Sequence, residues 1–137
     1  MPSLYVHVPF CVRKCSYCAF YSVPLAGDRV KAYLSALKQE IELRKLEALE
    51  KSQKKLERES QLESQIKTQI KSQIKSQAEF STLFVGGGTP TALNESELDA
   101  LLTLINTNYR FRPGAEKTVE ANPGTLTTEK LEVLKKQ

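Results

Sequence analysis

The chain has 137 residues, of which 40% are hydrophobic and 26% are charged, a composition typical of one small soluble domain. The formal net charge of +4 is too small to indicate a nucleic-acid partner, and no basic patch with interleaved aromatic residues occurs. No apolar run approaches the roughly 20 residues that cross a bilayer, and the start of the chain lacks the features of a signal peptide. We therefore expect no transmembrane segment.

The first βα unit is predicted over residues 1–44. Residues 3–8 alternate in polarity like a strand, with Tyr5 and His7 on one face, and Pro9 ends it because proline cannot donate to a ladder. A loop then runs to about residue 24. A helix follows, with Asp28 as the expected N-cap. Its apolar positions are helically spaced and predict a face packed on the sheet: Val30, Tyr33, Leu34, Leu37 and Ile41.

Residues 45–79 are predicted to form a polar helical insertion. They contain neither Pro nor Gly, and residues 60–77 repeat a four-residue pattern of the type Ser-Gln-Ile-Lys. A row spaced by four residues drifts around a helix, so it does not form the straight seam of a heptad coiled coil. We favour a solvated or partly disordered insertion, with a partner-binding coiled coil as the alternative.

Two further βα units are predicted over residues 80–137. The second has a strand at 80–85, a Gly-Gly-Gly-Thr-Pro turn at 86–90, and a helix capped by Asn94 with Glu97 in a capping box. The third has a strand at 116–121 after a loop at 106–114, and a last helix that begins near residue 127 or 128. Alternating strands and helices indicate parallel βαβ units, so the fold class is α/β.

All three cysteines of the chain lie in the loop after the first strand, at Cys11, Cys15 and Cys18. Three thiolates can hold three irons of a [4Fe-4S] cluster, whereas electron-transfer clusters usually have four cysteine ligands. The spacing therefore predicts a cluster with one open iron, at which a cosubstrate binds. Thiols that hold iron must stay reduced, which indicates the cytoplasm.

Other interpretations of the cysteines remain open at this point. They could be ordinary buried thiols, or one disulfide with a spare thiol. They could also bind zinc, with His7 as the fourth ligand that a zinc site requires.

Three features are expected at the carboxyl ends of the strands, where functional residues of βα barrels gather. They are the cysteine loop, the glycine turn at 86–90, and Glu120 with the Asn-Pro-Gly turn that follows it. Glycines let a backbone approach a ligand closely, although a tight turn alone would also explain them. Glu120 is suited to bind a hydroxyl or ammonium group, with a surface salt bridge as the alternative.

The C-x3-C-x2-C spacing resembles the radical S-adenosylmethionine (SAM) superfamily. Three segments narrow the resemblance, Tyr-Val-His-Val-Pro-Phe-Cys at 5–11, Phe-Val-Gly-Gly-Gly-Thr-Pro at 84–90 and Val-Glu-Ala-Asn-Pro-Gly at 119–124. They are similar to the oxygen-independent coproporphyrinogen III oxidases and the related HemW heme chaperones. The resemblance implies that the chain is the N-terminal three βα units of a partial (β/α)6 barrel.

The resemblance also implies roles for individual residues. Cys11, Cys15 and Cys18 would bind the cluster. Tyr5, Gly87 and Glu120 would contact a first SAM, Gly88 and Thr89 would lie near a second SAM site, and the backbone of Tyr17 would touch the adenine. His7 would pack inside the barrel rather than bind metal. An electron from the reduced cluster would cleave a C–S bond of SAM and form a 5′-deoxyadenosyl radical.

Two departures favour the chaperone branch of this family. The oxidases have a further cysteine two residues after the last cluster ligand, where this chain has Phe20, and they have an extension before the first strand. We therefore expect heme binding and transfer to acceptor proteins, with heme or porphyrin, an electron donor and a heme acceptor as partners. The alternatives are coproporphyrinogen decarboxylation by a SAM-dependent oxidoreductase, and a truncated fragment or interaction module without catalysis.

Overall fold

The computed structural model describes residues 2–59 and 79–137. Within these ranges the main sheet has three parallel strands in the order β1-β4-β5, formed by β1 (Ser3–Val8), β4 (Phe80–Gly87) and β5 (Phe111–Val119). The helices are α1 (Gly27–Glu59), α3 (Glu95–Asn108) and α4 (Thr128–Lys136). The predicted α/β class with parallel strands is confirmed, and the described strands form an open sheet rather than a closed barrel.

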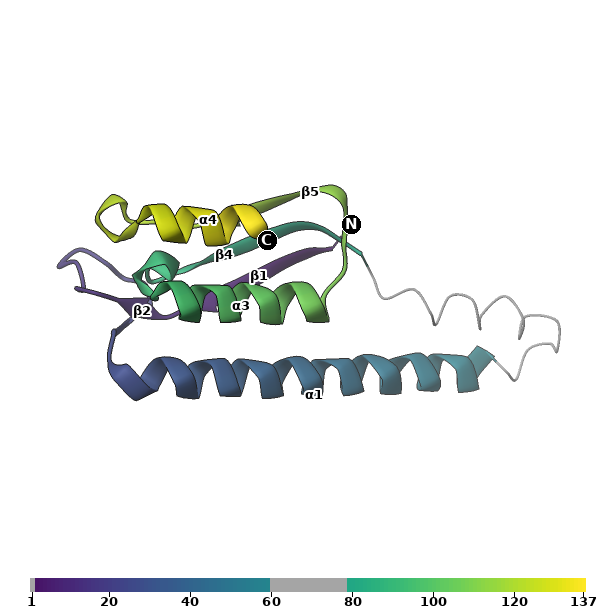
Figure 1. Cartoon of the computed structure of the whole chain (residues 1–137). Coiled ribbons are helices and arrows are strands. Elements are labelled where there is room, and N and C mark those ends of the chain that lie inside the picture. The colour runs from purple at the N-terminus through teal and green to yellow at the C-terminus, as the bar shows by residue number, and fades with distance from the viewer. Residues whose placement is uncertain (1, 60–78) are drawn as a thin grey trace.

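The helices cover one face of the sheet and leave the other face open (Figure 1). Alternation along the strands decides which side chains face the helices. The core side chains are at most 7% exposed and come from β1, β2, β4, α1, α3 and the segment before α3: Val6, Val8, Phe10, Val30, Leu83, Val85, Leu93, Leu98, Leu101, Leu102 and Ile105. On the open face Tyr5 stacks on Phe84, with ring centroids 6.0 Å apart. Tyr5 and His7 therefore share the face that the sequence pattern predicted for them.

Helix α3 begins as predicted. The side chain of Asn94 accepts a hydrogen bond from the backbone N–H of Glu97, and the Glu97 carboxylate accepts one from the N–H of Asn94, so the capping box is confirmed. Thr127 caps α4, at the predicted start of that helix. Helix α1 differs, because it begins at Gly27 and contains Asp28 in its first turn, so the prediction of Asp28 as N-cap was wrong.

The bounds predicted for the third strand were also wrong. The prediction placed a loop at 106–114 and a strand at 116–121, whereas α3 continues to Asn108 and β5 runs from Phe111 to Val119. The pairing with β4 jumps from Phe80–Phe111 to Thr82–Glu116, so extra residues of β5 form an irregularity there. This irregularity contains Pro113 and Gly114, whose φ of 75° suits glycine. A proline and a glycine in an edge strand therefore need not end it.

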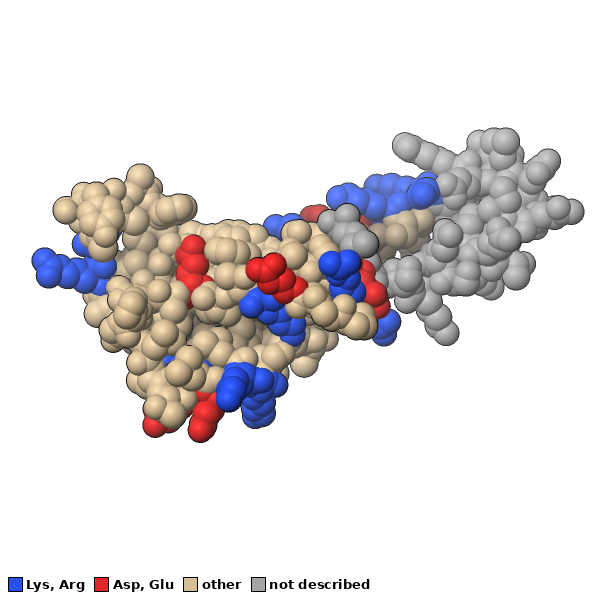
Figure 2. Space-filling model, turned by 90° about the horizontal axis from the view of Figure 1, so that it is seen from above, with Lys and Arg blue, Asp and Glu red and all other residues tan. Residues whose placement is uncertain are grey.

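Helix α1 runs without interruption past residue 45, where the polar insertion was expected to begin, and it extends well beyond the sheet (Figure 1). The repeat at 60–77 lies outside the described residues. None of the helices within residues 2–59 and 79–137 is both long and apolar enough to cross a membrane. In Figure 2 acidic and basic side chains are interspersed on the visible face, so the positive charge does not gather there into one patch.

Candidate functional site: the carboxyl edge of the sheet

The cysteine loop begins and ends on two short paired strands, β2 (Phe10–Cys11) and β3 (Val23–Pro24), which the sequence pattern did not predict. The N–H of Val23 donates to the carbonyl of Pro9 at 2.7 Å, and the N–H of Leu25 donates to the carbonyl of Cys11 at 2.9 Å. Within the loop, the N–H of Cys18 donates to the carbonyl of Cys15 at 3.1 Å. The ends of the loop are therefore fixed beside the carboxyl end of β1.

The glycine turn lies directly against this loop. The N–H of Gly88 donates to the carbonyl of Val8 at 2.8 Å, and the N–H of Thr89 donates to the carbonyl of Phe10 at 2.7 Å. A Cβ atom on Gly88 would lie 2.5 Å from the carbonyl oxygen of Phe10, so only glycine fits this approach. The thiol of Cys11 lies 3.8 Å from the hydroxyl of Thr89. The structure therefore brings the first cysteine and the glycine turn together.

Glu120 reaches the same turn from β5. Its carboxylate accepts a hydrogen bond from the N–H of Gly87 at 2.9 Å, and its own N–H donates to the carbonyl of Val85 at 2.9 Å. A Cβ atom on Gly86 would lie 2.8 Å from this carboxylate, and Gly87 has a φ of 117°. Both glycines thus have a structural reason to be present, in addition to any ligand contact.

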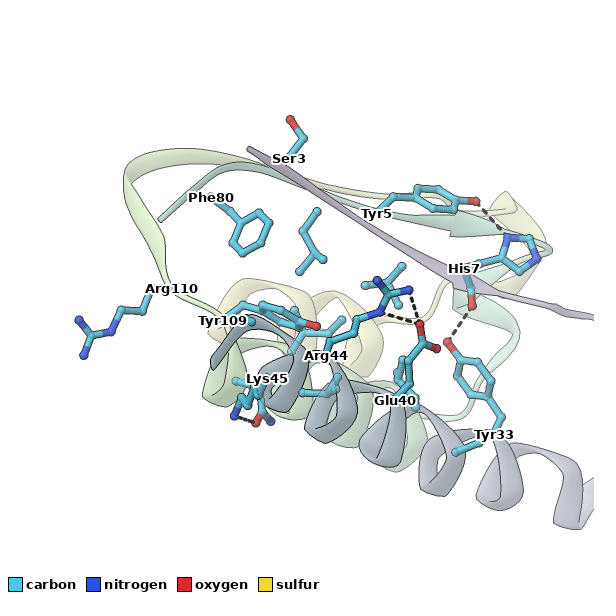
Figure 3. Close-up of a pocket in the computed structure, with 18 residues that line it drawn as sticks. Ser3, Tyr5, His7, Tyr33, Glu40, Arg44, Lys45, Phe80, Tyr109 and Arg110 are labelled. Atoms are coloured by element: carbon cyan, nitrogen blue, oxygen red, sulfur yellow. Dashed lines mark hydrogen bonds and ion pairs between the residues drawn. The ribbon is translucent and has the colours of Figure 1, made fainter. Parts of the chain in front are cut away.

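His7 bridges the open face and the cysteine loop. Its Nε2 lies 3.2 Å from the carbonyl oxygen of Tyr21. Its Nδ1 lies 3.1 Å from the hydroxyl of Tyr5 (Figure 3). A carbonyl only accepts, so Nε2 carries a proton and donates to Tyr21. His7 therefore links Tyr5 to the far end of the cysteine loop. The sequence reasoning placed His7 inside the barrel but had no signal for these two contacts.

The three cysteines are free thiols, with Cys15 exposed and the other two partly exposed. Tyr17 is also exposed, and a hydrogen bond to the Cys15 thiol, reinforced by the charges of Cys15 and Cys18, raises the pKa of its hydroxyl. Within residues 2–59 and 79–137, no group of three or more His, Cys, Asp or Glu side chains is arranged to hold a metal ion. In an iron-sulfur cube each thiolate binds a different iron, so convergence on one point is not required. Three free thiols on one accessible loop have the donor chemistry that such a cluster needs.

A cavity with a volume of about 760 Å³ lies elsewhere, between β1 and α1. Figure 3 shows Tyr33, Glu40 and Arg44 of α1 on one side and Tyr5 and His7 of β1 on the other. Tyr33 donates to the carbonyl of His7 at 2.8 Å, and Arg44 pairs with Glu40 at 2.6 Å. The cysteines do not line this cavity, so its volume alone does not mark the site of chemistry.

Residues 5–137 match the family model described as the Radical SAM superfamily. Together with the C-x3-C-x2-C loop at the carboxyl edge of a parallel sheet, this match shows that the chain belongs to the radical SAM superfamily.

Several curated proteins are similar to the chain. The heme chaperone HemW of Bacillus subtilis is 35% identical over 138 residues, covering 98% of this chain and 29% of that protein. The oxygen-independent coproporphyrinogen III oxidase of Salmonella typhimurium is 29% identical over 134 residues, covering 97% of this chain and 23% of that protein. Among solved structures, coproporphyrinogen III oxidase (HemN) from Escherichia coli, a radical SAM enzyme, matches with a TM-score of 0.69 and 28% identity. That match covers 98% of this chain and 25% of HemN, so the chain corresponds to about a quarter of these proteins.

Proposed function

We propose that the chain is part of a heme-handling radical SAM protein of the HemW type. The observation that carries the proposal is the contact between the cysteine loop and the glycine turn, through the bonds Gly88–Val8 and Thr89–Phe10. Together with the 3.8 Å contact between the Cys11 thiol and the Thr89 hydroxyl, these bonds support a site in which the cysteine loop and the glycine turn act together. The family match makes an iron-sulfur cluster and SAM the expected occupants.

Cys11, Cys15 and Cys18 are the proposed cluster ligands. Cys15 is exposed and Cys11 and Cys18 are partly exposed, so iron could reach all three thiols. When bound, the cluster would supply the electron that splits a C–S bond of SAM into methionine and a 5′-deoxyadenosyl radical. The chain itself would fix the loop ends and hold the cosubstrate.

Tyr5, Gly87 and Glu120 are the proposed contacts of the first SAM. The Glu120 carboxylate accepts one hydrogen bond from Gly87, and its exposed side chain retains acceptor capacity for a SAM ammonium or hydroxyl group. Tyr5 is 54% exposed on the same open face. Gly88 and Thr89 are proposed for a second SAM site, and the backbone of Tyr17 for adenine. With these assignments, SAM would bind on the open face of the sheet.

Two observations favour the chaperone over the decarboxylase. Phe20 occupies the position of the additional cysteine of the oxidases and is 67% exposed within the cysteine loop. The HemW proteins of Bacillus subtilis and Lactococcus lactis are 35% and 32% identical to the chain, whereas the HemW protein of Escherichia coli and the Salmonella oxidase are both 29% identical. We therefore propose heme binding and transfer to an acceptor protein, without propionate decarboxylation.

Anaerobic reconstitution tests the cluster. The protein should acquire about four irons per chain with the absorbance of a [4Fe-4S] cluster, and its spectrum should change when SAM is added. The variants Cys11→Ser, Cys15→Ser and Cys18→Ser should each lose most of this iron, while Ser16→Ala should keep it. A colourless protein that binds one zinc would contradict the proposal.

Two further measurements on the reconstituted protein distinguish a heme chaperone from a decarboxylase and from a fragment without catalysis. Heme titration followed by incubation with an apo-hemoprotein should show binding and transfer. Incubation with coproporphyrinogen III, SAM and a reductant should leave the propionates intact. Formation of vinyl groups would identify a decarboxylase instead, and an inert protein with neither cluster nor heme would support a fragment without catalysis.

A further inference from the structure

Lys130 on α4 is buried, with only 8% of its surface exposed. Its ammonium group donates to the carbonyl of Thr91 at 2.9 Å and to the carbonyl of Thr125 at 3.0 Å. Thr91 lies in the short helix η1 (Pro90–Ala92), and Thr125 in the short helix η2 (Pro123–Thr125). Burying a charged amine is costly unless polar groups surround it, so these two carbonyls explain how the charge is accommodated.

A chain of hydroxyl contacts supports the same junction. The hydroxyls of Thr91 and Thr125 lie 2.6 Å apart, and the Thr125 hydroxyl donates to the carbonyl of Asn122 at 2.7 Å. The N–H of Asn122 donates to the Thr91 hydroxyl at 3.4 Å. Thr91 is fully buried. The loop after β4 and the loop after β5 are therefore joined on the helix side of the sheet.

The same two loops meet a second time on the open face, where Glu120 accepts from Gly87. Thr91 directly follows the glycine turn at 86–90, and Asn122 follows Glu120 by two residues. A change in the distance between the two loops at Lys130 would therefore change the distance between Gly87 and Glu120, because only short, hydrogen-bonded segments separate these positions. The junction thus lies just behind the proposed SAM contacts.

We propose that Lys130 is a positioning residue that sets the distance between the glycine turn and Glu120, and thereby the affinity for SAM. This inference rests on the proposed function, because SAM is the ligand that these groups would bind. Lys130 acts from the helix side and does not itself touch SAM. The cysteine loop is held by β1, β2 and β3, so cluster assembly should not depend on Lys130.

Lys130→Met tests the inference, because methionine keeps a long apolar side chain but donates no hydrogen bond. Lys135→Met, at an exposed position of the same helix, is the matched control. In the metal-free protein, NMR-detected hydrogen exchange should accelerate about tenfold at the amides of Gly87 and Asn122 in Lys130→Met only. This factor corresponds to ~1.4 kcal/mol.

The second measurement uses the reconstituted protein. The dissociation constant for SAM should rise about tenfold in Lys130→Met, again ~1.4 kcal/mol, while the iron content per chain stays at the wild-type level. A purely structural role would lower iron content and SAM affinity together. Unchanged exchange at Gly87, or unchanged SAM affinity, would overturn the inference.

Thr125→Val provides a milder change if Lys130→Met does not fold. It removes the hydroxyl contact to Thr91 but keeps the carbonyl that Lys130 binds. The same two effects are expected, each smaller, and their absence would again overturn the inference. If the wild-type protein binds no SAM at all, the proposed function fails, while the exchange rates still decide whether Lys130 holds the two loops together.

Discussion

The carboxylate of Glu120 accepts a hydrogen bond from the backbone N–H of Gly87 at 2.9 Å, across the gap between the ends of two neighbouring parallel strands. Gly87 has a φ of 117°, and Gly86 leaves no room for a Cβ atom beside the same carboxylate. The glycines therefore allow the acid to lie directly on the turn. This contact places the one acidic side chain of the proposed SAM site against the backbone that is proposed to hold the same ligand.

Glu120→Gln should weaken SAM binding with little effect on folding. Glutamine keeps the shape of the side chain but removes its charge, and hydrogen bonds to charged groups contribute about 1.5–3 kcal/mol. The dissociation constant for SAM, measured by equilibrium dialysis, should therefore rise by about tenfold or more. Glu132→Gln, an exposed acid on α4, should leave it unchanged. Equal SAM affinity in both variants would show that Glu120 does not contact SAM.

Gly88→Ala should destabilise the protein. The added Cβ would lie 2.5 Å from the carbonyl oxygen and 2.9 Å from the carbonyl carbon of Phe10, and backbone atoms cannot move aside as a flexible side chain can. Overpacking of this kind costs about 1–3 kcal/mol. Gly27→Ala is the matched control, because its Cβ would have nothing within 4 Å. Urea unfolding should separate the two variants, and similar midpoints would show that the glycine turn is not tightly apposed to the cysteine loop.

Leu101→Ala should cost about 2–5 kcal/mol, because removing a buried leucine leaves a cavity. Leu101 is fully buried between α3 and the sheet, whereas Leu49 on α1 is 54% exposed. Leu49→Ala should therefore change the free energy of unfolding by less than ~0.5 kcal/mol. Thermal or urea unfolding followed by circular dichroism provides the comparison. A large cost for Leu49→Ala would mean that this part of α1 is covered in solution.

Much of the fold follows from local patterns that the sequence displays directly. The first strand was predicted at residues 3–8 and is observed at Ser3–Val8, because alternation and Pro9 define both its face and its end. The capping box at Asn94 and Glu97 is equally local, since both partners lie within one turn. The resemblance to radical SAM proteins rested on short motifs at strand ends, which the sequence displays directly. The match to the family model confirms it.

Features that depend on contacts between distant segments could not be predicted. Pro113 and Gly114 indicated a loop, yet pairing with β4 on one side keeps them within an irregular strand. Nothing in the residues around Lys130 indicates that the carbonyls of Thr91 and Thr125 bind its ammonium group. The pairing of Glu120 with Gly87 likewise depends on strand order, which a single motif does not specify.

Tyr33 should make stability depend on alkaline pH. Burial raises the pKa of its hydroxyl above the ordinary value of 10.0, and the hydroxyl donates to the carbonyl of His7 at 2.8 Å. The native state therefore holds the phenolic proton more strongly than the unfolded state. The resulting stabilisation is fully present below pH 10.0 and is lost as pH rises from there through the native pKa.

Tyr33→Phe isolates this contribution. Wild type should be more stable than the variant at pH 8, and the difference should narrow above pH 10 by at most ~1.4 kcal/mol per pH unit, the value for one proton. Urea unfolding at several pH values, followed by circular dichroism, measures both curves. The other tyrosines are present in both proteins and cancel in the difference. Parallel curves between pH 8 and 11 would show that Tyr33 is not buried against β1 in solution.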